Sequence, residues 1–393
     1  MRRASLFAAG IFVGCMLGES QAQVLKPGQG EVILGARQGN VVELPGFLTE
    51  KIPFIDYEKV VLPGPQYIIS DDPEYIRDPE AMALKEAVNP GSVRLYVYNV
   101  NGIKEPKEID RKITAVIKNT GKSDMHIRMM KYSSQKPSSN YFQIGKQGLA
   151  DYFASQGEEK IRTVKPGQVI AIDEQLEKNI VKYNELVHGF YEFVVDQPGE
   201  IAVVQTAPST PGPEAFKKMK AVVSSRHSNA GRGLFGVSNY KVTANAVFDT
   251  KKGAAQIMLA DGKQDPWIIG RDASTGQQAR LAGNYGVMYD IELKWKSSDG
   301  KGLALLTWNS RSLDNKWCNG MAASMIVSQG LFKEGIVKLP SDRLTTKGAP
   351  EAIVIQVFPP AKDGGENTIR MTYSPPGASC LPTPLIFVPV DLK

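Results

Sequence analysis

Alternation of apolar and polar side chains constrains the fold of this chain more than any other feature. Between Val287 and Trp295 every second residue is apolar, and Asp290, Glu292 and Lys294 lie between them. Successive side chains of a β-strand point to opposite faces, so this segment predicts a strand with one buried and one solvated face. Similar segments recur between turns rich in Gly, Pro and Asn. No long helical patterns alternate with them, which argues against a doubly wound α/β fold.

These segments predict a mainly β fold of two antiparallel β-sandwich domains, Ig-like or jelly-roll-like, with few short helices. The content of Gly (37) and Pro (25) fits many strands joined by turns. A helix is predicted over 140–155, where apolar residues recur at three- and four-residue spacing, and a second over 173–183. The main predicted strands are 94–98, 112–118, 125–132, 189–195, 200–206, 239–248, 255–259, 266–269, 286–295, 303–308, 335–339, 352–358, 368–373 and 385–390.

Composition also predicts the domain boundaries. Residues 23–90 contain many prolines and are expected to form an irregular extension that packs on the first domain. The first sandwich, with an inserted helix, is predicted over 91–206. A Pro-rich linker with a short helix is expected over 207–232, and the second sandwich over 233–393.

The segment 1–22 has the pattern of a secretory signal peptide. Arg2 and Arg3 precede an apolar run, and small residues at its end predict cleavage between Ala22 and Gln23. The apolar run is too short to cross a bilayer, so no transmembrane segment is expected after its removal. We therefore expect an exported protein that is secreted, periplasmic or associated with the cell surface.

Cysteine usage carries two further expectations. Cys15 ends a short motif that resembles a lipobox, so acylation at Cys15 is an open alternative to plain secretion. Removal of the signal peptide leaves Cys318 and Cys380, and an even pair in an exported chain predicts a disulfide. It would close a loop of about 62 residues and stabilise the fold by roughly 4 kcal/mol. Two free, buried thiols are the alternative.

Charge and glycine patterns limit the expected partners. The formal net charge of +6 is small for this length and spread along the chain, so no nucleic-acid partner is expected. Residues Gly231–Gly236 fit the pattern G-x-G-x-x-G. A dinucleotide site needs a preceding buried strand and a following helix, and the sequence predicts neither here. No cofactor is therefore expected.

Motifs for nucleophilic catalysis are weak. Ser133–Lys136 and Ser298–Lys301 fit S-x-x-K, but both are expected in turns, where no helix places the Lys beside the Ser. The histidines His126, His188 and His227 are far apart in sequence, and no G-x-S-x-G segment marks a nucleophile. The catalytic residues stay unknown, and the sequence favours a protein that is not an enzyme.

Carboxylates near turns raise two alternatives. Asp261, Asp265 and Asp272 could ligate calcium, but they lack the regular spacing of a calcium loop, so no metal site is expected. Asp290 and Glu292 share one strand face and could form the acid/base pair of a glycosidase. The simpler interpretation is the solvated face of an amphipathic strand.

All four tryptophans lie in the second half of the chain. Trp295 is expected to be buried by its strand pattern. Trp308 and Trp317 flank a polar loop that contains Asn309 and Arg311. Exposed aromatic rings can stack on sugars, so these four residues are the predicted ligand-binding site. Core packing around the predicted disulfide is the alternative.

The second half resembles a group of uncharacterised exported β-rich bacterial proteins. The resemblance covers about 226–393 and is carried by 231–235 (GRGLF), 283–289 (GNYGVMY), 375–382 (PPGASCLP) and the strand over 385–390. It implies export and a β-rich fold. No activity and no site residue come with it.

Together these features predict an exported, non-catalytic binding or structural protein of the bacterial cell envelope. Its expected partner is a cell-wall or surface polysaccharide, or another envelope protein. One alternative is a secreted hydrolase that acts on glycans. Another is a surface-assembly subunit joined through an exposed edge strand.

Overall fold

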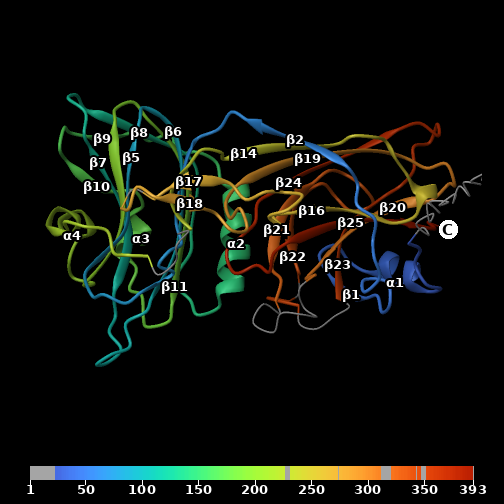
Figure 1. Ribbon diagram of the computed structural model, residues 1–393, viewed down its shortest axis with the longest axis horizontal. Helices are drawn as coiled ribbons and strands as arrows, with labels where there is room; N and C mark the ends of the chain where they lie inside the picture. The colour runs from blue at the N-terminus through green and yellow to red at the C-terminus, as the bar shows by residue number, and fades with distance from the viewer. Residues whose placement is uncertain are drawn as a thin grey trace, which may run out of the picture.

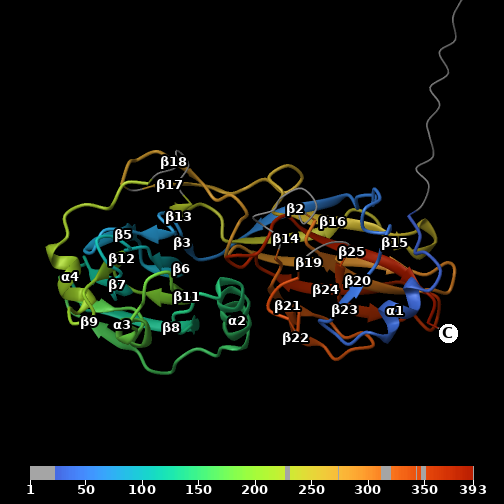
Figure 2. The same ribbon diagram turned by 90° about the horizontal axis from the view of Figure 1, so that it is seen from below.

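Two β-sandwiches lie side by side along the long axis of the molecule, and helix α2 (Tyr141–Ala154) stands between them (Figures 1 and 2). The computed structural model describes residues 23–225, 231–272, 274–310, 320–341, 343–346 and 351–392. The predicted signal peptide, with its cleavage residue Ala22 and the lipidation candidate Cys15, lies outside these residues. The mainly β, sandwich-type fold predicted from the sequence is confirmed.

The first sandwich packs a nine-stranded sheet on a four-stranded sheet. Its core lies between them and contains Ile68, Leu95, Ile117 and Val203, all buried. The larger sheet has the order β18-β17-β13-β3-β6-β11-β8-β9, with β4 beside β6, and the smaller has the order β10-β7-β12-β5. The bounds are β3 (Gln66–Ser70), β4 (Tyr75–Ile76), β5 (Ala81–Val88), β6 (Gly91–Asn101), β7 (Lys112–Asn119), β8 (Met125–Ser134), β9 (Arg162–Val164), β10 (Val169–Ala171), β11 (Leu186–Val195), β12 (Gly199–Thr206), β13 (Arg232–Phe235), β17 (Ile269–Arg271) and β18 (Gln278–Arg280).

The second sandwich packs a five-stranded sheet on a seven-stranded sheet. Trp295, Tyr289, Leu305 and Phe387 are buried between them, which confirms the predicted burial of Trp295. The orders are β1-β23-β20-β25-β16 and β2-β14-β19-β24-β21-β22, with β15 beside β19. The bounds are β1 (Val41–Glu43), β2 (Tyr57–Leu62), β14 (Asn239–Ala244), β15 (Phe248–Asp249), β16 (Ala255–Leu259), β19 (Met288–Lys296), β20 (Gly302–Trp308), β21 (Ala323–Val327), β22 (Gly335–Leu339), β23 (Glu351–Phe358), β24 (Asn367–Tyr373) and β25 (Thr383–Val390).

Strand pairing is mostly antiparallel, as expected, but parallel pairs occur in both sandwiches. In the first, β3 runs parallel to β6, with Ile68 opposite Leu95. In the second, β14 runs parallel to β19, with Lys241 opposite Asp290. The sheets are therefore mixed: between β3 and β6 the chain passes through β5 in the other sheet of the same sandwich, and between β14 and β19 it passes through β17 and β18 of the first sandwich.

Helix α2 fills the space between the sandwiches. The side chain of Asn140 accepts a hydrogen bond from the backbone of Gln143 and caps its first turn, and Ser155 follows its last residue. The apolar stripe predicted from the sequence buries Ile144 and Leu149. One side of the helix packs on β8 and β11 and the other on β21 and β22, so α2 joins the two sandwiches, and its buried apolar residues belong to the same cluster as the core of the second sandwich.

The N-terminal part of the chain does not pack as we expected from its sequence. The segment 23–90 is expected to pack on the first domain, and β3, β4 and β5 do lie there, but β1 pairs with β23 and β2 pairs with β14, both in the second sandwich. Helix α1 (Gln29–Gly35) and the residues after it cover the outer face of the five-stranded sheet, where Phe47 and Leu48 are buried. Apolar side chains in this Pro-rich stretch form a separate cluster on that outer face, which pattern alone does not reveal.

The predicted boundary over 207–232 also differs from the structure. The expected short helix is present as α4 (Gly212–Lys218), which packs on β7 and β12. Beyond it, however, β13 pairs with β3, and β17 and β18 extend the same sheet of the first sandwich. Each sandwich is thus built from segments that are separate in sequence, and the chain crosses between them repeatedly (Figure 2).

Two smaller helical elements complete the fold. The helix expected over 173–183 is only α3 (Glu174–Lys178), where the side chain of Asp173 caps the first turn. A 3-10 turn, η1, covers Thr250–Lys252. In the described part of the chain, no helix has the length and apolar character needed to cross a membrane.

Candidate functional site

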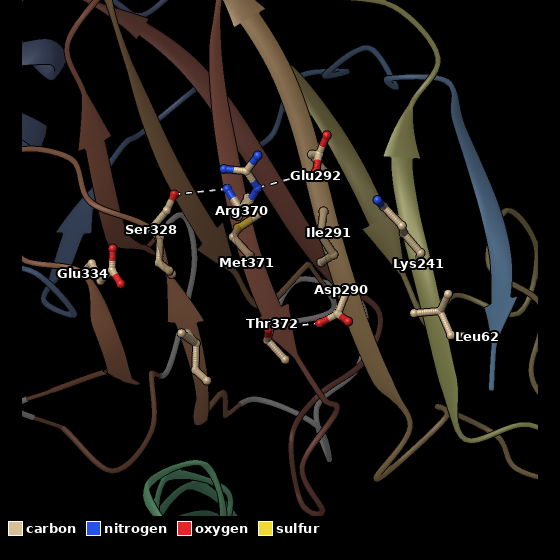
Figure 3. Close-up of a pocket in the computed structure, with 12 residues that line it drawn as sticks. Leu62, Lys241, Asp290, Ile291, Glu292, Ser328, Glu334, Arg370, Met371 and Thr372 are labelled. Carbon is tan, nitrogen blue, oxygen red and sulfur yellow. Dashed lines mark hydrogen bonds and ion pairs between the residues drawn. The ribbon is translucent and has the colours of Figure 1, made fainter. Parts of the chain in front are cut away.

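A groove of about 570 Å³ lies on the outer face of the seven-stranded sheet of the second sandwich (Figure 3). It runs across β14, β19, β24 and β21, and β2 borders it. Its lining residues are Leu62, Lys241, Asp290, Ile291, Glu292, Ile326, Val327, Ser328, Glu334, Arg370, Met371 and Thr372. A volume of this size lies within the range of small-molecule and oligomer-binding sites.

Strand register brings the charged side chains of the groove together. Lys241 on β14 lies opposite Asp290 on β19. On the other side of β19, Asp290 lies opposite Thr372 and Glu292 opposite Arg370, both on β24. Because directly opposed residues point to the same face of a sheet, cations, carboxylates and a hydroxyl form a continuous polar array.

Hydrogen bonds hold the centre of this array in place. The Thr372 hydroxyl donates to Asp290 Oδ1 at 3.1 Å. Arg370 Nε lies 3.6 Å from Glu292 Oε2, and the Arg370 backbone N–H donates to Ser328 Oγ at 3.1 Å. The Arg370 side chain is 70% exposed, so most of its guanidinium donors remain available to a ligand.

The two ends of the groove carry opposite charges. Lys241 lies at one end and Glu334 at the other, as Figure 3 shows. Among the described residues neither side chain has an ion-pair partner. Between them, half-buried Ile326 and buried Met371 add an apolar part to the lining. The groove thus offers donors, acceptors and apolar contact to one ligand.

Of the four residues predicted to bind a ligand, the structure describes Trp308 and Asn309. Trp308 ends β20 and packs in the core over the five-stranded sheet, with 7% of its surface exposed. Asn309 is buried beside it. Arg311 and Trp317 lie outside the described residues, so the loop that would complete this site is not defined. A ring buried to this extent offers little surface for stacking on a sugar.

Of the two cysteines in the predicted disulfide, the structure describes Cys380. Cys380 is 1% exposed. Cys318 lies outside the described residues, so its pairing with Cys380 stays a prediction.

The carboxylates considered as calcium ligands have structural partners. Asp265 is fully buried, pairs with Lys59, and accepts a hydrogen bond from the Tyr289 hydroxyl at 2.7 Å. Burial and the nearby Asp265 charge raise the pKa of Tyr289 well above its usual value. Asp261 accepts hydrogen bonds from the backbone of its own loop, and Asp272 pairs with Arg232. Within the described ranges, no group of three or more His, Cys, Asp or Glu side chains is arranged to hold a metal ion.

The remaining motifs take structural positions. His126 is exposed and bonds to Asp196 at 2.7 Å, whereas His188 is buried beside Tyr96; His227 lies outside the described residues. Ser133 lies in β8 and is 3% exposed, so its expected position in a turn is wrong. Ser298 lies in a polar turn, as expected. The glycine-rich segment leads into β13 and not into a helix.

Sequence reasoning missed three charged residues of the groove. Asp290 and Glu292 were singled out because they share a strand face, but Lys241, Arg370 and Glu334 were not considered. The segments of Lys241 and Arg370 alternate in polarity as β19 does, and Glu334 lies in the turn before β22, but the sequence does not show which strands are neighbours.

Comparison with known proteins adds little to this description. No protein-family model and no curated protein matches the chain. Among solved structures it is similar to the CUB1-EGF-CUB2 domain of human MASP-1/3, with 9% identity over 85% of this chain and 99% of that one, at a TM-score of 0.18. It is also similar to GK1651 from Geobacillus kaustophilus, with 10% identity over 91% and 97%, at a TM-score of 0.14. Both TM-scores are too low to support an argument about fold or function.

Proposed function

We propose that this chain is an exported, non-catalytic binding protein of the cell envelope, and that it holds a wall or surface glycan in the groove of the seven-stranded sheet. The observation that carries the proposal is the polar array of Lys241, Asp290, Glu292, Arg370 and Thr372 on one face of that sheet.

The chemistry of the array suits a hydroxylated and charged polymer. Carboxylate oxygens accept hydrogen bonds from sugar hydroxyls, and the guanidinium of Arg370 donates several in a fixed plane. Charges at both ends suit a glycan that carries amino and carboxyl groups along its length. Export, expected from residues 1–22, would place the groove where such polymers occur.

Binding to a glycan array that includes peptidoglycan fragments tests this function. We expect Arg370→Ala and Lys241→Ala each to weaken binding by about tenfold, which corresponds to loss of one charge-assisted hydrogen bond. Lys294→Ala is the matched control, because Lys294 is exposed on β19 but does not line the groove. Binding that survives both groove changes but is lost in Trp317→Ala would move the site to the loop after Trp308. No binding to any glycan would reject the glycan as ligand.

A second candidate function, a glycan hydrolase, is favoured by one observation. Asp290 and Glu292 both line the groove and lie two residues apart on β19. A strand rises about 3.3 Å per residue, so their Cα atoms lie about 7 Å apart, and side chains that extend in parallel from them would hold the two carboxyl groups at about the separation used by inverting glycosidases. Hydrolysis of a bound glycan that is abolished in Asp290→Asn and Glu292→Gln would establish this function in place of simple binding. Tight binding with no product over long incubation would reject it.

A further inference from the structure

Within the ranges that the structure describes, one side of the edge strand β2 has a row of backbone groups without hydrogen-bond partners. The backbone N–H of Asn245 donates to Asp56 O at 3.0 Å, just before β2 begins. From this pair onward, the backbone N–H and C=O groups of Glu58, Val60 and Leu62 point toward β14, and each of these residues lies opposite a β14 residue. Because backbone direction alternates along a strand, the N–H and C=O groups of Tyr57, Lys59 and Val61 point to the open side.

The pairing of β14 with its other neighbour supports this assignment. Met288 N–H donates to Ser238 O at 2.9 Å, so Ser238 and Tyr240 direct their backbone groups toward β19. The backbone N–H and C=O groups of Lys241 and Thr243 must then point toward β2. This agrees with the pairs Lys241–Val60 and Thr243–Glu58. In the described part of the chain, no backbone hydrogen bond reaches the outward groups of β2.

Other sheet edges in the described ranges are short or covered. Strands β1, β9, β10 and β18 have three residues each. The free side of β16 is covered where Gln256 N–H donates to Pro53 O, and that of β5 where Val223 N–H donates to Met82 O. Helix α2 packs beside β22. In contrast, β2 has six residues, and its Val60 and Val61 are 46% and 53% exposed.

We propose that β2 is the interface with a second copy of this chain, which adds its own β2 in antiparallel orientation about a two-fold axis at Val60. Exposed edges of this kind are templates for strand addition. In this register Lys59 and Val61 exchange backbone hydrogen bonds with Val61 and Lys59 of the copy. Pairing ends at Tyr57, because Pro63 opposite it has no N–H and its carbonyl already accepts a hydrogen bond from Asn239 Nδ2 at 3.2 Å.

Side chains also favour this register. It places Val60 opposite its own copy, Lys59 opposite Val61, and Glu58 opposite Leu62, so each exposed valine is covered and no like charges face each other. Of the neighbouring registers that pair outward groups with outward groups, those centred on Glu58 or Lys59 would place two like charges directly opposite, and the one centred on Val61 would place Lys59 opposite Pro63, which has no N–H to donate. The two-fold arrangement closes on itself, and its product is a dimer that joins two seven-stranded sheets and brings the two grooves onto one continuous face.

Cysteine substitution tests both the dimer and its register. Directly opposed residues that are not hydrogen-bonded lie about 4.5 Å apart at Cα, which suits a disulfide. We expect Val60→Cys in the full-length chain, purified from the exported fraction, to form a covalent dimer in an oxidising buffer. Val61→Cys is the matched control: it is as exposed, but its copy is offset by two residues, and we expect the chain to stay uncrosslinked.

Sedimentation velocity over a wide concentration range measures the association itself. We expect the unmodified chain to dimerise reversibly and Val60→Lys, which places like charges opposite each other, to raise the dimer dissociation constant at least about tenfold. Ile336→Lys, an exposed apolar residue on the opposite edge strand, should leave it unchanged. A monomer at all concentrations, or equal crosslinking of both cysteine variants, would overturn the proposal. Dimerisation insensitive to Val60→Lys would assign the interface elsewhere and would also overturn it.

Discussion

The guanidinium of Arg232 donates two hydrogen bonds to a single carboxylate oxygen, Oδ2 of Asp272, at 3.2 and 3.1 Å, and the arginine side chain is fully buried. The same group also donates to Ala83 O and Val223 O, at 3.0 and 2.7 Å. Four separate segments therefore meet at one charge. Burial raises the pKa of Asp272, but hydrogen bonds from Ser274 and the charge of Arg232 outweigh burial and hold the pKa below its ordinary value.

The first prediction concerns this ion pair. Asp272→Asn leaves a buried guanidinium without its counter-charge, so we expect a loss of about 3–5 kcal/mol in the free energy of unfolding, measured by urea denaturation. Lys85→Ala, which breaks the more exposed pair with Glu200, should change it by less than about 1 kcal/mol. Because the folded pKa of Asp272 is lowered, its contribution is present above the ordinary aspartate pKa and is lost as pH falls through the folded value. Equal stability of the two variants would contradict this account.

His188 provides a second prediction, on pH. Burial lowers its pKa from 6.5 to about 3, its ring packs edge-on against Tyr96, and Nδ1 has no hydrogen-bond partner among the residues that the structure describes. Below pH 6.5 the unfolded chain binds a proton that the folded chain excludes. The folded state therefore carries no protonation penalty from this group above about pH 6.5, and the free energy of unfolding falls by roughly 1.4 kcal/mol per pH unit below that, down to about pH 3.

Urea denaturation at several pH values checks this effect. We expect the slope of stability against pH between about 4 and 6 to be smaller in His188→Gln by roughly that amount. His126→Gln, at an exposed histidine, should retain the slope. A slope that is the same in all three proteins would show that His188 is protonated in the folded state.

Gly148 carries a third prediction, on packing. A Cβ at this position of α2 would lie 2.5 Å from both Cε1 and Nδ1 of His188. Gly148→Ala should cost about 1–3 kcal/mol, even though alanine favours a helix by about 1 kcal/mol, because neither backbone nor ring can move freely. Gly35→Ala, where no atom lies within 4 Å, is the control and should be neutral or slightly stabilising. Thermal denaturation that finds both variants equally stable would mean that the ring moves aside.

A fourth prediction concerns the buried pair of Lys59 and Asp265. The carboxylate also accepts hydrogen bonds from Ala260 N and the Tyr289 hydroxyl, both at 2.7 Å, and the ammonium lies 4.2 Å from the centre of the Tyr240 ring. Lys59→Met should therefore cost about 3–5 kcal/mol. In a double-mutant cycle, Lys59→Met with Asp265→Asn should cost clearly less than the sum of the two single changes. Additive losses would show that the two groups are energetically independent.

Local signals in the sequence were sufficient for several elements. The strands predicted over 255–259 and 335–339 coincide with β16 and β22, and the helix predicted over 140–155 is α2 with its two flanking residues. These succeed because periodicity and a capping side chain such as that of Asn140 are properties of neighbouring residues.

Elements defined by distant partners could not be predicted. Leu234 on β13 pairs with both Ile68 and Arg271, and Val41 pairs with Ile353. Such short strands are stabilised by contacts with segments far away in sequence, and their own residues carry little preference. The groove follows the same rule. The sequence indicated that Asp290 and Glu292 share a face, but only pairing with β14 and β24 makes Lys241 and Arg370 their neighbours.

The place of β25 in its sheet has a consequence for how the protein is made. β25 lies between β20 and β16, yet it is the last strand in sequence, and β23, the partner of β1, also comes late. A growing chain cannot complete the second sandwich until about residue 390 has been synthesised. The apolar residues near the N-terminus that belong to it, such as Phe47, stay without their core throughout synthesis. A fragment that stops at residue 225 would leave them uncovered, so expression of the first half alone should yield an aggregation-prone product.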